Sequence, residues 1–226
     1  CSNTSWTGGG GGLYAATATV QNCYFVTNII FKGYGGGGAF VQKTFVNNSY
    51  FAMNRGANNS YSYGGGMYLD NGSWNQIRNC LVISNTVAAQ GGGIYAYNYG
   101  GTISNCIVAF NRSGNHGGGI NIGSTVGVTD CLISNNYGNP GGGVYGWNSQ
   151  TYKNCVVVNN QSGGLAGGMW VMGSTLNDCL IAGNAAKGGG GVYDTGYGLN
   201  TFSSCLILDN RSTAPGIGGG GVLLAG

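Results

Sequence analysis

The chain has 226 residues, of which 49 are glycine and only 6% are charged, and its net charge of +3 comes from lysines and arginines that are scattered singly. This pattern excludes the basic footprint of a nucleic-acid-binding protein, and no apolar run approaches the roughly 18 residues of a transmembrane helix. Low charge and abundant glycine are typical of disorder, but 42% of the residues are hydrophobic and they recur at regular positions. We therefore expect a folded chain built from repeats.

The first landmark of each repeat is a cysteine. From Cys80 onward the cysteines are separated by 26, 25, 24, 24 and 26 residues, and Ser49 occupies the same place in an otherwise matching unit. The residue just before the cysteine or serine is Asn, Asp or Ser in every unit from position 23 onward. The column consists of Cys1, Cys23, Cys80, Cys106, Cys131, Cys155, Cys179 and Cys205.

From position 23 onward, an asparagine follows five residues after each cysteine, or after Ser49, with an apolar residue three positions before it. Stacked asparagine amides can bond to one another and to backbone groups at a bend, so we expect a structural ladder at a turn inside each coil. A binding role for these amides is the lesser alternative. The ladder consists of Asn28, Asn54, Asn85, Asn111, Asn136, Asn160, Asn184 and Asn210.

A glycine cluster closes each unit and is followed by one aliphatic residue and then, in most units, an aromatic residue. Because side chains alternate between the two faces of a strand, the aliphatic residue is expected to face inward and the aromatic residue outward. The outward stripe consists of Tyr14, Phe40, Tyr68, Tyr95, Tyr145, Trp170 and Tyr193. It is either a ladder that stacks on itself, which we favour, or a surface that binds a ligand.

Each unit thus contains two or three short β-branched runs separated by Gly, Asn or Ser, without a helical period. Repeats of 22 to 31 residues with this pattern predict an all-β fold, a right-handed parallel β-helix of about nine coils. We expect a single domain over residues 1–226, with no evident caps. Its coils should stack about 4.8 Å apart, so that equivalent residues form columns.

The same alternation places the cysteines inside. Stacked neighbours lie within the Cα distance that a disulfide allows, but a parallel pair in register points its Cβ atoms alike. We therefore favour free, buried thiols that act as small hydrophobic groups over disulfides. The spacing gives no zinc site, and we predict neither a metal nor a cofactor.

The paired landmarks resemble the repeats of the chlamydial polymorphic outer-membrane proteins, which carry Gly-Gly-Ala-[Ile/Leu/Val] and Phe-x-x-Asn motifs. Gly37–Phe40, Gly91–Ile94 and Gly141–Val144 are similar to the first motif, and Phe25–Asn28 and Phe51–Asn54 match the second. Gly replaces the motif Ala in most units, Val or Ile replaces Phe in six, and there is no C-terminal barrel. The resemblance implies a β-helix outside the cell, with an adhesive or structural role.

The functional prediction is a non-enzymatic structural or surface β-solenoid that is extracellular or at a cell surface. Its partners would be further copies stacked head to tail, or other surface proteins, because the repeat pattern reaches both ends of the sequence. A fragment of a longer solenoid, or a lipidated Cys1, would look the same. The alternative is an adhesin or glycan-binding segment that uses the aromatic stripe. A polysaccharide lyase or hydrolase needs paired carboxylates, and the five Asp residues, with no Glu and one His, are too dispersed for that.

Overall fold

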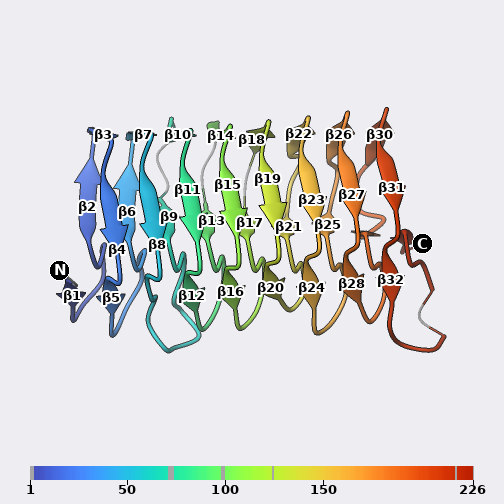
Figure 1. The fold of residues 1–226 in the computed structure, drawn as a ribbon, viewed down its shortest axis with the longest axis horizontal. Coiled ribbons are helices and arrows are strands. Elements are labelled where there is room, and N and C mark those ends of the chain that lie inside the picture. Colours follow the sequence, from blue (N-terminus) through green and yellow to red (C-terminus); the bar gives the residue numbers. More distant parts are fainter. Residues whose placement is uncertain (1–2, 71–73, 98–99, 124, 217, 226) are drawn as a thin grey trace.

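A computed structural model describes residues 3–70, 74–97, 100–123, 125–216 and 218–225. All regular elements in these ranges are short parallel β-strands that stack side by side along one axis, so the chain is a parallel β-helix, as predicted (Figure 1). The strands form eight stacked turns, and one sheet adds a ninth strand. In these ranges there is no helix of the length and apolarity that crossing a membrane requires.

The nine-stranded sheet holds the strands that follow the glycine clusters. Its members are β2 (Leu13–Ala16), β6 (Ala39–Gln42), β9 (Met67–Leu69), β13 (Ile94–Ala96), β17 (Ile120–Ile122), β21 (Val144–Gly146), β25 (Met169–Val171), β29 (Val192–Asp194) and β33 (Val222–Leu224). An eight-stranded sheet holds the strands that precede the cysteines. Its members are β3 (Thr19–Gln21), β7 (Phe45–Asn47), β10 (Gln76–Arg78), β14 (Gly101–Ser104), β18 (Val126–Thr129), β22 (Thr151–Lys153), β26 (Thr175–Asn177) and β30 (Thr201–Ser203).

A second eight-stranded sheet follows the cysteines. Its members are β4 (Tyr24–Val26), β8 (Tyr50–Ala52), β11 (Leu81–Ile83), β15 (Ile107–Ala109), β19 (Leu132–Ser134), β23 (Val156–Val158), β27 (Leu180–Ala182) and β31 (Leu206–Leu208). Two-residue strands follow the asparagines in the described turns except that of Asn54, where Arg55 makes isolated bridges to Ile29 and Thr86. These strands are β1 (Thr4–Ser5), β5 (Ile29–Ile30), β12 (Thr86–Val87), β16 (Arg112–Ser113), β20 (Tyr137–Gly138), β24 (Gln161–Ser162), β28 (Ala185–Ala186) and β32 (Arg211–Ser212).

The corner between the two eight-stranded sheets explains the Asn, Asp or Ser that precedes each cysteine. All eight of these residues have a positive φ, between 48° and 54°. This left-handed backbone conformation is strained for most side chains, whereas Asn and Asp adopt it more readily. The residues are Asn22, Asn48, Asn79, Asn105, Asp130, Asn154, Asp178 and Ser204.

The glycine clusters form a corner where the neighbouring coil leaves no room for a side chain. A Cβ atom on Gly119 would lie 2.6 Å from the carbonyl oxygen of Gly143 in the next coil and 2.9 Å from the Nδ2 of Asn136. Real Cβ atoms do not come that close, so this position accepts no side chain. The glycine clusters and the asparagine ladder are therefore packed against each other and depend on one another.

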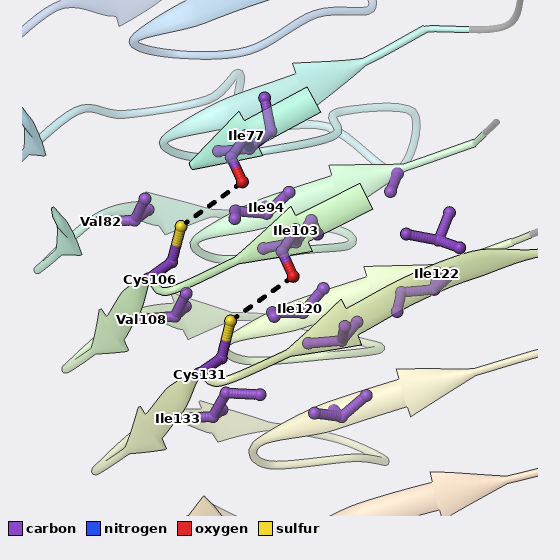
Figure 2. Packing of buried hydrophobic residues seen from close by; sticks show 14 of the residues in the cluster. Ile77, Val82, Ile94, Ile103, Cys106, Val108, Ile120, Ile122, Cys131 and Ile133 are labelled. Carbon is purple, nitrogen blue, oxygen red and sulfur yellow. Dashed lines mark hydrogen bonds between the residues drawn. The ribbon is translucent and has the colours of Figure 1, made fainter. Parts of the chain in front are cut away.

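The interior is one continuous apolar core in which aliphatic side chains from all three main sheets stack in columns (Figure 2). Ile77, Ile103 and Val128 form part of one column, and each is fully buried. In the next turn Tyr152 takes this place, and its hydroxyl has no hydrogen-bond partner. Burying each aliphatic side chain contributes roughly 1.5–3 kcal/mol, so the core is the main source of stability.

Candidate functional site

The predicted aromatic stripe forms a ladder of rings on the outer face of the nine-stranded sheet. Strand pairing aligns Tyr14 with Phe40 and Phe40 with Tyr68, and the ring centroids of both pairs are 5.0 Å apart. Tyr95 continues this stack at 5.2 Å from Tyr68. A second stack joins Tyr145, Trp170 and Tyr193, with centroid distances of 5.3 and 4.3 Å. We call these seven rings the aromatic ladder.

Most of the aromatic ladder is not open to solvent. Phe40, Tyr68 and Tyr95 are 8–9% exposed and Tyr145 is 3% exposed, although all of them point away from the core. Tyr63, which comes from the segment before the glycine cluster, covers the first stack, and its ring lies 4.5 Å from that of Tyr95. Burial raises the pKa of Tyr145 to about 12. A long ligand therefore cannot use the ladder as a continuous platform.

The aromatic ladder is interrupted once between these stacks, at Asn121. Asn121 pairs with Tyr95 in the preceding strand and with Tyr145 in the following strand, so it stands where a ring would complete the ladder. The interruption leaves a pocket of about 310 Å³, which we call the ladder gap. Its main lining residues are Gln90, Tyr95, Tyr97, His116, Asn121 and Trp147.

Aromatic rings form both end walls of the ladder gap. On one side the ring of Tyr97 is nearly parallel to that of Tyr95, at an interplanar angle of 11°. On the other side His116 stacks on Tyr145 at 4.3 Å, and Trp147 meets Tyr145 edge-on at 5.7 Å. His116 lies in the irregular segment between β16 and β17, and its ring is part of this stack.

The floor of the ladder gap is polar and tightly built. The Nδ2 of Asn121 donates a hydrogen bond of 3.2 Å to the Oε1 of Gln90. Gly123 lies beneath Tyr97, and a Cβ atom there would be only 2.7 Å from the Tyr97 ring. Glycine at this position thus allows Tyr97 to lean over the floor.

The ladder gap is electrically neutral. None of its lining residues is Asp, Glu, Lys or Arg. Burial lowers the pKa of His116, so this ring is uncharged at pH 7. The site is therefore suited to an uncharged ligand.

The asparagine ladder lies inside the coil corner, as its spacing predicts, and its amides are fully paired in the middle of the stack. The Oδ1 of Asn136 accepts hydrogen bonds from the backbone N–H of Asn111 at 2.9 Å and from its Nδ2 at 3.1 Å. The Nδ2 of Asn136 donates to the carbonyl of Val108 at 2.9 Å and to the Oδ1 of Asn160 at 3.0 Å. These four bonds use both donors and both acceptors of the amide. This arrangement indicates a structural role.

Sequence reasoning missed the first described member of this ladder. Asn3 donates from its backbone N–H and its Nδ2 to the Oδ1 of Asn28, both at 3.1 Å, and Thr4 pairs with Ile29. The register of the first turn therefore follows Asn3, although it comes only two residues after Cys1. The available signal was the 25-residue spacing from Asn3 to Asn28, which falls within the 24 to 31 residues that separate the other members of the ladder. Cys1 itself lies outside the described residues.

The described cysteines form a column of free thiols at the corner between the eight-stranded sheets. Cys106 and Cys131 are buried, and their Sγ atoms point toward the carbonyls of Ile77 and Ile103 in the preceding turns, at 3.8 and 3.6 Å (Figure 2). Hydrogen bonds with neighbouring thiols, followed by burial, raise the pKa of Cys106. Ser49 replaces the thiol within the column, and its Oγ donates to the carbonyl of Asn47 at 2.8 Å. This arrangement indicates that the cysteine column packs the core.

The aspartates are used locally and do not converge. Asp130 accepts a hydrogen bond of 3.0 Å from Asn154, and Asp194 accepts bonds from the Gly196 N–H and the Asn200 amide at 2.9 and 2.6 Å. Over the described ranges, no three His, Cys or Asp side chains gather where they could hold a metal ion. The ladder gap is thus the best-formed candidate site, and its chemistry is that of binding.

Comparison with known proteins agrees with the fold. The family model for a right-handed β-helix region matches residues 68–225, which are 158 of the 226 residues. This match includes the whole ladder gap and gives the handedness expected for parallel crossovers. No curated protein and no solved structure gives a significant match. The likeness to the chlamydial polymorphic outer-membrane proteins therefore stays a prediction.

Proposed function

The chain belongs to the right-handed β-helix family, and from this premise we propose that it is a non-enzymatic structural β-solenoid of the extracellular space or a cell surface. The observation that carries the proposal is the unbroken asparagine ladder, which runs from Asn3 to Asn210. In a solenoid each repeat contacts only its neighbours, so a bonded column along the axis couples all turns. The result is a stiff rod.

Two further features support this proposal. The surface carries few charges and many Asn, Ser, Thr and Gly residues, a composition that suits an extracellular product. Each aspartate either accepts a local hydrogen bond or occupies a corner position with a positive φ. They do not form the pair of carboxylates that glycoside hydrolysis needs. Enzymes and non-enzymes both occur among β-helices, so the proposal rests on the residues and not on the fold.

Assembly with further copies is part of the proposal. Strands at the end of any parallel β-helix have backbone N–H and C=O groups that point along the axis and lack a partner. A second copy stacked coaxially would pair them and extend the asparagine ladder. Such assembly would make the protein a filament subunit.

Electron microscopy of the purified chain at micromolar concentration tests the structural role. Unbranched fibres with a regular axial repeat are the expected result, and discrete short rods would overturn the filament part of the proposal. In parallel, the protein is incubated with neutral and acidic polysaccharides, and new reducing ends or unsaturated products are measured. Cleavage of any of them would overturn the non-enzymatic function.

A further inference from the structure

The ring position between Tyr95 and Tyr145 is already occupied. These two residues belong to strands two coils apart, which corresponds to about 9.6 Å at about 4.8 Å per coil. The ring of His116 stacks on Tyr145 at 4.3 Å and takes up that interval. The open space of the ladder gap therefore lies beside these rings, next to Gly123, with Tyr97 and Trp147 among its lining residues.

Two large rings at the gap are left open to solvent. Tyr97 and Trp147 are 47% and 44% exposed, whereas the ladder rings behind them are almost fully buried. They stand two coils apart with Gly123 between them, since Gly123 bonds to the carbonyl of Ala96 and Trp147 to that of Ile122. Exposed aromatic faces that flank a hollow are typical of sites where a ligand stacks.

The polar groups at the gap are amides and hydroxyls. Asn121, Gln90 and Asn148 each contribute a carboxamide, which can both donate and accept hydrogen bonds. The Asn121–Gln90 bond holds two of these amides in place beneath the space. A ligand with an apolar face and several hydroxyl groups matches this combination. The absence of Lys and Arg from the lining residues disfavours an acidic ligand.

We propose that the ladder gap binds one neutral pyranose ring of a glycan, inserted between the aromatic walls with its hydroxyl groups on the amides of Asn121, Gln90 and Asn148. Sugar rings present apolar C–H faces to aromatic rings and carry hydroxyl groups at their edges. One sugar ring can therefore stack on the aromatic walls and form hydrogen bonds with the amides of the floor. The volume of about 310 Å³ is at the small end of the range for ligand sites, about 300–1,000 Å³. This site is independent of the structural function proposed above.

The most direct test fills the gap with a larger side chain from its floor. Asn121→Tyr should place a ring in the space bounded by Tyr97, His116 and Trp147 and remove the room for a ligand. Binding to the full chain is measured by tryptophan fluorescence and by saturation-transfer NMR. The probes are neutral hexose oligosaccharides of glucose, galactose and mannose, with oligogalacturonate as the acidic comparison.

We expect the wild-type chain to bind at least one neutral probe and Asn121→Tyr to weaken that binding at least tenfold. Trp147→Ala should also weaken binding at least tenfold. The matched control is Tyr197→Ala, which removes an aromatic ring of 72% exposure outside the gap and should leave binding unchanged.

Three results would overturn the proposal. They are no binding of any neutral probe at millimolar concentration, unchanged binding in Asn121→Tyr, and tighter binding of oligogalacturonate than of every neutral sugar. Displacement of the sugar by indole from the wild type, but not from Trp147→Ala, would place the sugar on the aromatic wall and support the proposal. Binding of indole without binding of any sugar would assign the gap to planar aromatic ligands and would overturn it.

Discussion

Two ladders run along this solenoid, and they differ in continuity. The inner ladder of asparagines has a member in every described turn, whereas the outer ladder of aromatic rings is interrupted at Asn121. Each inner amide bonds to the turn before it and the turn after it, so a missing member would leave buried partners unsatisfied. An outer ring contributes only stacking, and water can replace it. The interior thus tolerates no gap, while the exterior can give up a ring to form a site.

The largest loss of stability is expected when the inner ladder is broken. The same substitution at Asn121, in the outer ladder, serves as the comparison. Asn136→Ala removes four buried hydrogen bonds and leaves donors on Asn111 and the carbonyl of Val108 without partners. We expect a loss of about 3–5 kcal/mol in the free energy of unfolding. Asn121→Ala removes one bond to Gln90 and should cost only about 1 kcal/mol. Denaturant unfolding measures both, and equal losses would contradict the contrast between the ladders.

The glycine corner that packs against the inner ladder can be tested next. Gly119→Ala would place a Cβ atom 2.6 Å from a carbonyl oxygen of the adjacent coil and 2.9 Å from the Asn136 amide. We expect it to destabilise the fold by about 2–3 kcal/mol. Gly218→Ala is the control, because no atom lies within 4 Å of its added Cβ. Thermal unfolding should leave this control near the wild type, and a comparable loss in both variants would refute close packing as the cause.

A gain of stability is expected from a substitution at Phe110, the residue just before Asn111 of the inner ladder. Phe110 has a φ of 57° and a side chain that is 62% exposed, so it adopts a left-handed conformation and buries little. Phe110→Asn should stabilise the chain by about 1 kcal/mol, because Asn adopts this conformation more readily. Ile107→Asn, at an exposed strand position, should instead be destabilising. If both variants lose stability, the backbone of Phe110 is not strained.

The smallest expected effect is a pH dependence of stability at His116, whose ring stacks on Tyr145 of the aromatic ladder. The amides of the asparagine ladder do not titrate. Burial lowers the pKa of His116 in the folded state, so below about pH 6.5 the unfolded chain binds a proton more readily than the folded chain. Stability contributed by the neutral ring should therefore be lost as pH falls from 7 through the lowered pKa. His116→Gln should remove this part of the pH dependence, which unfolding midpoints at pH 7 and pH 5 will reveal. An unchanged pH dependence in His116→Gln would show that other groups cause it.

The repeat, the parallel β-helix and the positions of its columns can all be predicted from the amino-acid sequence alone. Constraints that recur in every coil leave a periodic mark: Asn or Asp at a positive φ, glycine where a Cβ atom would meet the next coil, and a paired amide at the corner. Asn3 was missed because its turn lacks the usual spacing from a cysteine, although its 25-residue spacing to Asn28 is ordinary.

Which outward rings are buried and which are open to solvent depends on how the coils pack together. The segments between the asparagines and the glycine clusters vary in length, so their aromatic residues, such as Tyr63, show no period that would place them over the ladder. In the sequence, Asn121 merely stands at a position that is aromatic in most units. It defines a pocket because Tyr97, His116 and Trp147 come from three successive coils and converge around it. Stacking of neighbouring coils brings these side chains together, and no local sequence pattern records that contact.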